Sequence, residues 1–275
     1  MTEGIRPSFT TTDGVRLNYT DEGSGRPVVL VAGHTAPISS WGLLTTTLLA
    51  TGHRVVGIDR RHTGASDFPD HGRRMARQGT DLHELLTFLG LDHPVVVASS
   101  MGCSATWAMI DLFGASGLGG LVLVDQTPKM VNEADWNLGM YDLTWDTLSE
   151  LVEVFGSPEA ETLPRFRRGE RVPPAAAMMP ILLELLATPY DHSQARPLLR
   201  DHAVQDWRDV LPRIDVPTLA IGGRRSEIWP VEHAEYIAKS IPGADLLVCE
   251  NSGHAPMWSE PDLFNAEVER FIAHV

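Results

Sequence analysis

A serine at a strand-to-helix turn is the clearest chemical feature of this 275-residue chain. Residues 94–99 (PVVVAS) form an apolar, β-branched run, and Ser100 stands between that run and a helical pattern that begins at Met101. Ala98 and Gly102 are small enough to let the chain turn sharply. Such a turn lifts a hydroxyl above the sheet at a helix N-terminus, where the helix dipole favours developing negative charge. The pattern therefore predicts that Ser100 is a nucleophile.

A histidine near the C-terminus is the predicted base for this serine. His254 lies in the loop NSGHAP, directly after a strand-like run at 245–250. In a parallel sheet, a loop after the last strand can bring a histidine to a serine that follows a central strand. We therefore expect His254 to accept the proton of Ser100.

These two residues need a sheet whose strands end at a common edge. Near-continuous apolar runs, as expected for strands covered on both faces, occur at 27–33, 54–59, 94–99, 120–125, 217–223 and 245–250. Helical patterns alternate with them at about 39–51, 72–90, 101–113, 231–240 and 261–274. The Asp13-Gly14 turn near the N-terminus predicts an antiparallel hairpin at the sheet edge. We predict an α/β fold with a mostly parallel central sheet of about eight strands and helices on both faces.

The interval from 127 to 215, between the runs at 120–125 and 217–223, predicts an inserted helical cap. It shows apolar residues at helical spacing, several prolines and no convincing strand. We therefore expect a core made of 1–126 and 216–275 and a cap at 127–215, inserted after the sixth strand. Trp136, Met140 and Trp145 fall in this cap, where they either line an apolar substrate pocket or simply pack the cap.

The motifs together resemble the α/β-hydrolase superfamily. The resemblance rests on the serine turn, on GHAP before an E-P-x-x-F helix start, and on the region 27–66, and it covers nearly all of the chain outside the cap. The family's usual acid position, in a G-x-x-D-x-x-x-P stretch, is occupied by Ser226, which cannot supply a carboxylate. The resemblance then implies Asp125, at the end of the strand after the serine helix, as the acid. Glu227 is the alternative.

The resemblance also implies an oxyanion hole. Ala32-Gly33-His34 stands where the family commonly has H-G-x, so the backbone N–H groups of His34 and Met101 are the expected donors. The His34 side chain would point into the pocket, where it binds a polar substrate group, acts as a second acid or base, or only fills the loop. Arg61, in a loop similar to the family's D-x-R-G-x-G-x-S, is expected to be structural.

Composition excludes several classes of partner. The chain has 22 Lys and Arg against 36 Asp and Glu, a formal net charge of −14, which disfavours nucleic acid and anionic membrane surfaces. The N-terminus shows no basic region followed by an apolar stretch, so we expect a cytoplasmic protein. Cys103 and Cys249 are expected to be small buried residues. No phosphate-binding glycine loop or metal-ligand cluster is apparent, so no cofactor and no metal are implied.

These observations predict a serine hydrolase. Its substrate would be a small, largely apolar ester, lactone or related carbonyl compound, cleaved through an acyl-enzyme. One alternative is a cofactor-free dioxygenase or C–C bond-cleaving enzyme, in which His254 and Asp125 form the base; the location of Asp125 and the presence of His34 suggest it. Another is a non-catalytic ligand-binding receptor on the same fold. A haloalkane dehalogenase is excluded, because that reaction needs a carboxylate where this chain has Ser100.

Overall fold

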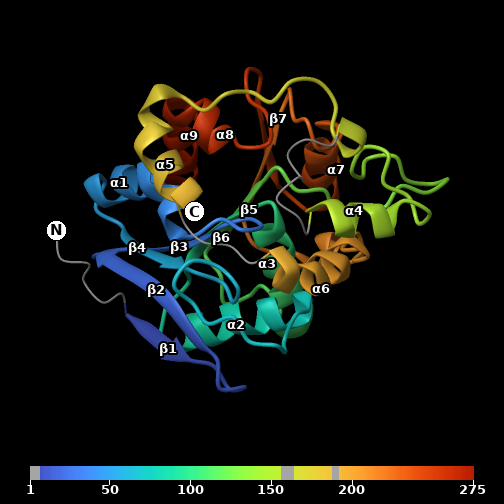
Figure 1. The fold of residues 1–275 in the computed structure, drawn as a ribbon. Helices are drawn as coiled ribbons and strands as arrows, with labels where there is room; N and C mark the ends of the chain where they lie inside the picture. The colour runs from blue at the N-terminus through green and yellow to red at the C-terminus, as the bar shows by residue number, and fades with distance from the viewer. Residues whose placement is uncertain (1–6, 156–163, 188–191) are drawn as a thin grey trace.

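The computed structural model describes residues 7–155, 164–187 and 192–275, which contain one eight-stranded sheet (Figure 1). The strand order is β1-β2-β4-β3-β5-β6-β7-β8. The strands are β1 Ser8–Thr10, β2 Arg16–Gly23, β3 Pro27–Val31, β4 Arg54–Ile58, β5 Val95–Ser99, β6 Gly120–Val124, β7 Thr218–Gly223 and β8 Asp245–Cys249. Strand β2 is antiparallel to both β1 and β4, and all other neighbours are parallel. The predicted α/β class, the mostly parallel sheet and the antiparallel hairpin at its edge are confirmed.

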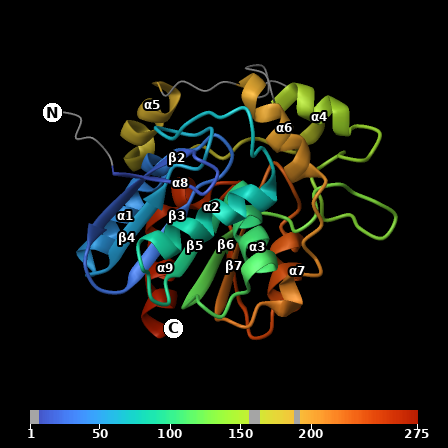
Figure 2. The ribbon, with the colours of Figure 1, turned by 90° about the horizontal axis from the view of Figure 1, so that it is seen from below.

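Helices cover both faces of the sheet, because alternate strand residues are apolar on both sides. On one face, Val28 and Leu30 belong to a core shared with α1 (Gly42–Ala50) and α9 (Pro261–His274). On the other, Val29 and Val31 belong to a core shared with α2 (Met75–Phe88), α3 (Met101–Phe113) and α7 (Glu232–Ser240). Figure 2 shows α2 and α3 in front of the sheet. Burial on both faces explains why the strands read as continuous apolar runs.

The described chain between β6 and β7 holds three α-helices separated by irregular segments. The helices are α4 (Leu148–Phe155), α5 (Met179–Ala187) and α6 (His192–Ala203). Short 3₁₀ turns at Pro164–Phe166 and Ala176–Met178 lie between α4 and α5, and another at Leu211–Arg213 follows α6. These helices lie beyond one end of the sheet (Figure 2). A small core that includes Met130, Leu151 and Phe166 joins this segment to Trp229 of the sheet region. The division into core and cap at 127 and 215 stays a prediction, and 156–163 and 188–191 lie outside the described residues.

The structure also bears on the expected burial of the two cysteines and on whether a helix could cross a membrane. Cys103, on α3, and Cys249, at the end of β8, are both buried, as predicted. Burial raises the pKa of the Cys249 thiol to about 12, so it is protonated at neutral pH. Among the residues described, no helix has the length and apolar character that crossing a bilayer requires.

Candidate active site

Ser100 occupies a strained turn between β5 and α3. Its φ is +52° and its ψ is −128°, a conformation that residues other than glycine rarely adopt. The Ser100 N–H donates to the Val124 carbonyl at 2.9 Å, which ties the turn to the neighbouring strand. A β-carbon at Gly102 would overlap the Val31 carbonyl oxygen, so this position has no room for a side chain. The strained backbone at Ser100 and the lack of a side chain at Gly102 together allow the sharp turn from β5 into α3.

Asp125 and His254 meet at the same edge of the sheet. Asp125 directly follows β6, and its side chain is completely buried. Its Oδ2 lies 2.7 Å from Nδ1 of His254. With Asp125 as a carboxylate, Nδ1 carries the proton and donates it, which leaves Nε2 of the imidazole with a free electron pair. This is the tautomer that can accept a proton from a hydroxyl.

Two further side chains donate to the same carboxylate oxygen of Asp125. The Ser226 hydroxyl lies 2.8 Å from Oδ2, and Nε1 of Trp229 lies 3.1 Å from it. The backbone N–H of Gly223 donates to Oδ1 at 2.9 Å. These donors compensate a buried charge and fix its position. Ser226, which stands at the family's usual acid position, therefore contacts Asp125 through its hydroxyl.

Glu227 contacts the main chain of His254. Its Oε2 accepts the backbone N–H of His254 at 3.2 Å, and its Oε1 lies 3.9 Å from Nη1 of Arg167. Asp125 contacts the ring of His254, whereas the contact with Glu227 is to the backbone. The geometry favours Asp125 over Glu227 as the group that can orient the imidazole.

The oxyanion loop passes beside Ser100. A β-carbon added to Gly33 would lie 2.9 Å from Cβ of Ser100 and 3.4 Å from its Oγ. His34 follows Gly33, and Met101 is the first residue of α3, where backbone N–H groups have no partner within the helix. Both predicted donor segments therefore meet next to the serine.

A cavity of about 440 Å³ contains the site. Ser100 and His254 both line it, together with His34, Met101 and Met140 from the predicted set. Its other apolar lining includes Met130, Leu151, Val172, Leu199, Ile228 and Met257. The space is large enough for a small organic molecule, and its lining also includes the charged side chains Arg167, Arg171 and Glu227.

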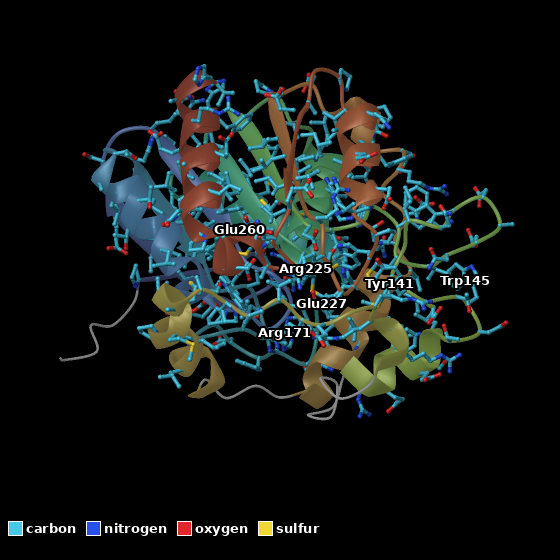
Figure 3. All side chains as sticks on the ribbon, turned by 90° about the horizontal axis from the view of Figure 1, so that it is seen from above. Tyr141, Trp145, Arg171, Arg225, Glu227 and Glu260 are labelled. Atoms are coloured by element: carbon cyan, nitrogen blue, oxygen red, sulfur yellow. The ribbon has the colours of Figure 1, made fainter. Side chains whose placement is uncertain are left out.

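The prediction that Trp136 and Trp145 line this pocket is wrong. Trp136 is buried elsewhere, where its Nε1 donates to the Lys129 carbonyl at 2.9 Å and its ring packs edge-on against Tyr236. Trp145 is 53% exposed and lies on an outlying loop, well away from Glu227 in Figure 3. Helical spacing identifies apolar residues but does not specify which neighbouring element each one contacts.

His202 is a cavity residue that the sequence patterns did not single out. It lies on α6 and is 4% exposed, and in the described part of the chain its Nδ1 has no hydrogen-bond partner. Burial, together with the nearby His34 and Arg60, lowers the pKa of His202 to about 3, so its imidazole is neutral. The available signal was its position three residues after Leu199, which places both on one helix face lining the cavity.

Comparison with known proteins gives matches over nearly the whole chain. The profile of the Alpha/beta hydrolase family matches residues 28–267. The non-heme chloroperoxidase of Kitasatospora aureofaciens is 28% identical over 275 residues, covering 97% of this chain and 99% of that protein. The non-heme haloperoxidase of Rhodococcus erythropolis is 26% identical over 276 residues, covering 97% and 99%. Among solved structures, an esterase from Exiguobacterium antarcticum has a TM-score of 0.86 at 25% identity, covering 98% of this chain and 100% of that one.

Proposed function

This chain belongs to the alpha/beta hydrolase family, and on that premise we propose that it is a serine hydrolase that cleaves an ester or lactone through an acyl-enzyme at Ser100. One observation carries the proposal: the buried Asp125 carboxylate lies 2.7 Å from Nδ1 of His254, in the same site as the strained Ser100 turn. The geometry of this acid and base, more than the fold, supports acyl transfer, because the fold alone hosts many reactions. The esterase likeness is consistent with it.

In the acylation step, Nε2 of His254 takes the proton of Ser100 as Oγ attacks the substrate carbonyl carbon. Asp125 holds the imidazole through Nδ1 and stabilises the imidazolium that forms. The backbone N–H groups of His34 and Met101 bind the oxyanion of the tetrahedral intermediate. The intermediate then collapses, and His254 returns the proton to the departing alcohol oxygen.

In the deacylation step, His254 takes a proton from water as the water oxygen attacks the acyl carbon. The tetrahedral intermediate then collapses, His254 returns the proton to Oγ of Ser100, and the acid is released. General base catalysis contributes about 10²- to 10⁴-fold to such steps. One oxyanion donor contributes about 10²- to 10³-fold. Loss of Ser100 or of His254 is therefore expected to remove nearly all turnover.

A second candidate activity is perhydrolysis, and the names of two relatives motivate it. One is named a non-heme chloroperoxidase and the other a non-heme haloperoxidase, and both match this chain over nearly its whole length. In this reaction hydrogen peroxide, in place of water, attacks the acyl group on Ser100. His254 takes the peroxide proton, and the products are a peroxy acid and the free serine. No redox change occurs on the protein.

The test is hydrolysis of p-nitrophenyl butyrate by wild type, Ser100→Ala and His254→Ala. We expect turnover by the wild type and its loss, by at least about 10³-fold, in both variants. Activity that survives in Ser100→Ala refutes the acyl-enzyme and favours a reaction that uses the His254–Asp125 pair as base, such as cofactor-free oxygenation. Binding of esters without turnover by the wild type favours a receptor. Peroxy acid formed with added peroxide, and lost in Ser100→Ala, supports perhydrolysis.

A further inference from the structure

A buried arginine holds the loop that follows β3. Arg60 is 4% exposed and donates from Nε to the Ala32 carbonyl at 3.1 Å and from Nη2 to the Gly33 carbonyl at 2.6 Å. Its Nη1 donates to Oε1 of Gln78, on α2, at 2.9 Å. The Gly33 carbonyl also accepts a longer bond, 3.4 Å, from the N–H of Ala36. One guanidinium therefore links the loop to the helix behind it.

The carbonyl of Gly33 and the N–H of His34 belong to one peptide unit. In a planar trans peptide the C=O and N–H point in opposite directions, so fixing the carbonyl on one side fixes the N–H on the other. Arg60 binds the carbonyl, and Gly33 lies so close to Ser100 that a β-carbon on it would be 3.4 Å from Oγ. A charged donor on the carbonyl also polarises the same peptide and strengthens its N–H as a donor.

We propose that Arg60 is a positioning residue for the oxyanion hole, which orients the Gly33–His34 peptide so that the His34 N–H faces the negative oxygen of the transition state. The inference rests on the proposed acyl transfer and goes beyond it, because none of the proposed steps assigns a role to Arg60. A rotated Gly33–His34 peptide would present a carbonyl in place of a donor. The guanidinium opposes that rotation with its short bond to the Gly33 oxygen.

The neighbouring Arg61 provides a matched control. It is completely buried, and it donates from Nε and Nη2 to the two carboxylate oxygens of Asp81 at 2.5 and 2.7 Å. Nη1 of Arg61 also lies 3.1 Å from the Asp13 carboxylate. These bonds connect α2 with the β1–β2 hairpin turn. Arg61 thus resembles Arg60 in burial, charge and sequence position, but it binds these two carboxylates, whereas Arg60 binds the carbonyls of the loop after β3.

The experiment compares Arg60→Met, Arg60→Lys and Arg61→Lys with wild type in p-nitrophenyl butyrate hydrolysis, with a thermal melt of each. We expect Arg60→Met to lower kcat about tenfold to 100-fold, less than the loss of a whole oxyanion donor, with KM changed less than about twofold. Affinity for a boronic acid, which mimics the tetrahedral intermediate, should fall by the same factor as kcat/KM. Arg60→Lys keeps the charge but not the forked donors, so its kcat should lie between those of wild type and Arg60→Met.

Arg61→Lys should lower the melting temperature and leave kcat and boronic acid affinity within about twofold of wild type. The inference is overturned if Arg60→Met keeps wild-type kcat, or if its kcat and boronic acid affinity do not fall together. Should Arg60→Met not fold, Arg60→Lys decides by the same two criteria. Ester turnover that requires Ser100 but not Arg60 overturns this inference alone. Turnover that does not require Ser100 overturns the proposed function as well.

Discussion

The substitution Asp125→Asn separates the two carboxylates that lie near His254. Oδ2 of Asp125 accepts hydrogen bonds from His254, Ser226 and Trp229, and Oδ1 accepts the N–H of Gly223. An asparagine has nearly the same shape but offers one oxygen and one NH₂ group. If the NH₂ group replaces Oδ2, it faces the fixed N–H of Trp229 and forces the proton of His254 onto Nε2. If it replaces Oδ1, it faces the N–H of Gly223.

Either placement lowers kcat. With the NH₂ group toward His254, Nε2 is protonated and cannot accept the serine proton. With the oxygen toward His254, the tautomer is kept, but a neutral amide replaces the charge that stabilises the imidazolium. Substitution of this acid by its amide in a serine protease triad lowers kcat about 10⁴-fold, and we expect about 10³- to 10⁴-fold here. That corresponds to about 4–5.5 kcal/mol at 1.36 kcal/mol per factor of ten.

The matched control is Glu227→Gln. Glutamine keeps an oxygen that can accept the backbone N–H of His254, now bonded to Oε2 at 3.2 Å, so kcat should fall less than about tenfold. The assay is steady-state hydrolysis of p-nitrophenyl butyrate, with circular dichroism to show that each variant is folded. A fall of about 10³-fold in Glu227→Gln, with Asp125→Asn nearly as active as wild type, would refute the assignment of Asp125 as the acid.

Three other predictions concern the framework of the site. Gly102→Ala inserts a methyl group against the Val31 backbone and should lower the free energy of unfolding by about 1–3 kcal/mol and activity at least tenfold. Gly117→Ala, whose added β-carbon meets nothing within 4 Å, should change neither. Equal urea midpoints and equal activities of the two variants would contradict this prediction. Asp81→Asn breaks the buried pair with Arg61 and should lower the free energy of unfolding by about 3–5 kcal/mol in urea, with kcat of the folded fraction unchanged. The pKa of His202 is about 3 in the folded state and about 6.5 in the unfolded state, so the unfolded chain binds a proton more readily. The contribution of neutral His202 to stability is therefore complete above about pH 6.5 and is lost as the pH falls toward 3. His202→Gln should therefore show a shallower fall of melting temperature from about pH 6.5 to about pH 4, and a slope as steep as that of wild type would count against it.

Most of the fold followed from the sequence because burial on both faces leaves a strong local signal. The run at 94–99 was predicted as a strand and is one at Val95–Ser99, and the helix predicted at 101–113 spans Met101–Phe113. The Ser100 turn was predictable for a related reason, since the close approach of Gly102 to β3 forces a small residue that is visible in the sequence.

Residues that depend on packing between distant segments were harder to predict. Trp136 was expected in the pocket, but it packs against Tyr236, a residue of α7 that is remote from it in the chain. His202 reaches the site region from α6 and belongs to no motif. Arg60 comes from the loop after β4, where it stands at the unspecified second position of the D-x-R-G-x-G-x-S pattern, so the motif does not indicate what it contacts. Sequence patterns specify which side of an element is buried, and tertiary packing decides what lies opposite.

The covalent role of Ser100 can be measured directly by labelling with diethyl p-nitrophenyl phosphate and locating the label by peptide mass spectrometry. The acyl-transfer account predicts one diethylphosphoryl group per chain, on the peptide that contains Ser100, and loss of ester hydrolysis in proportion to labelling. Ser100→Ala should take up no label at this peptide. Labelling at another residue, or full ester turnover by a chain labelled at Ser100, would contradict the account.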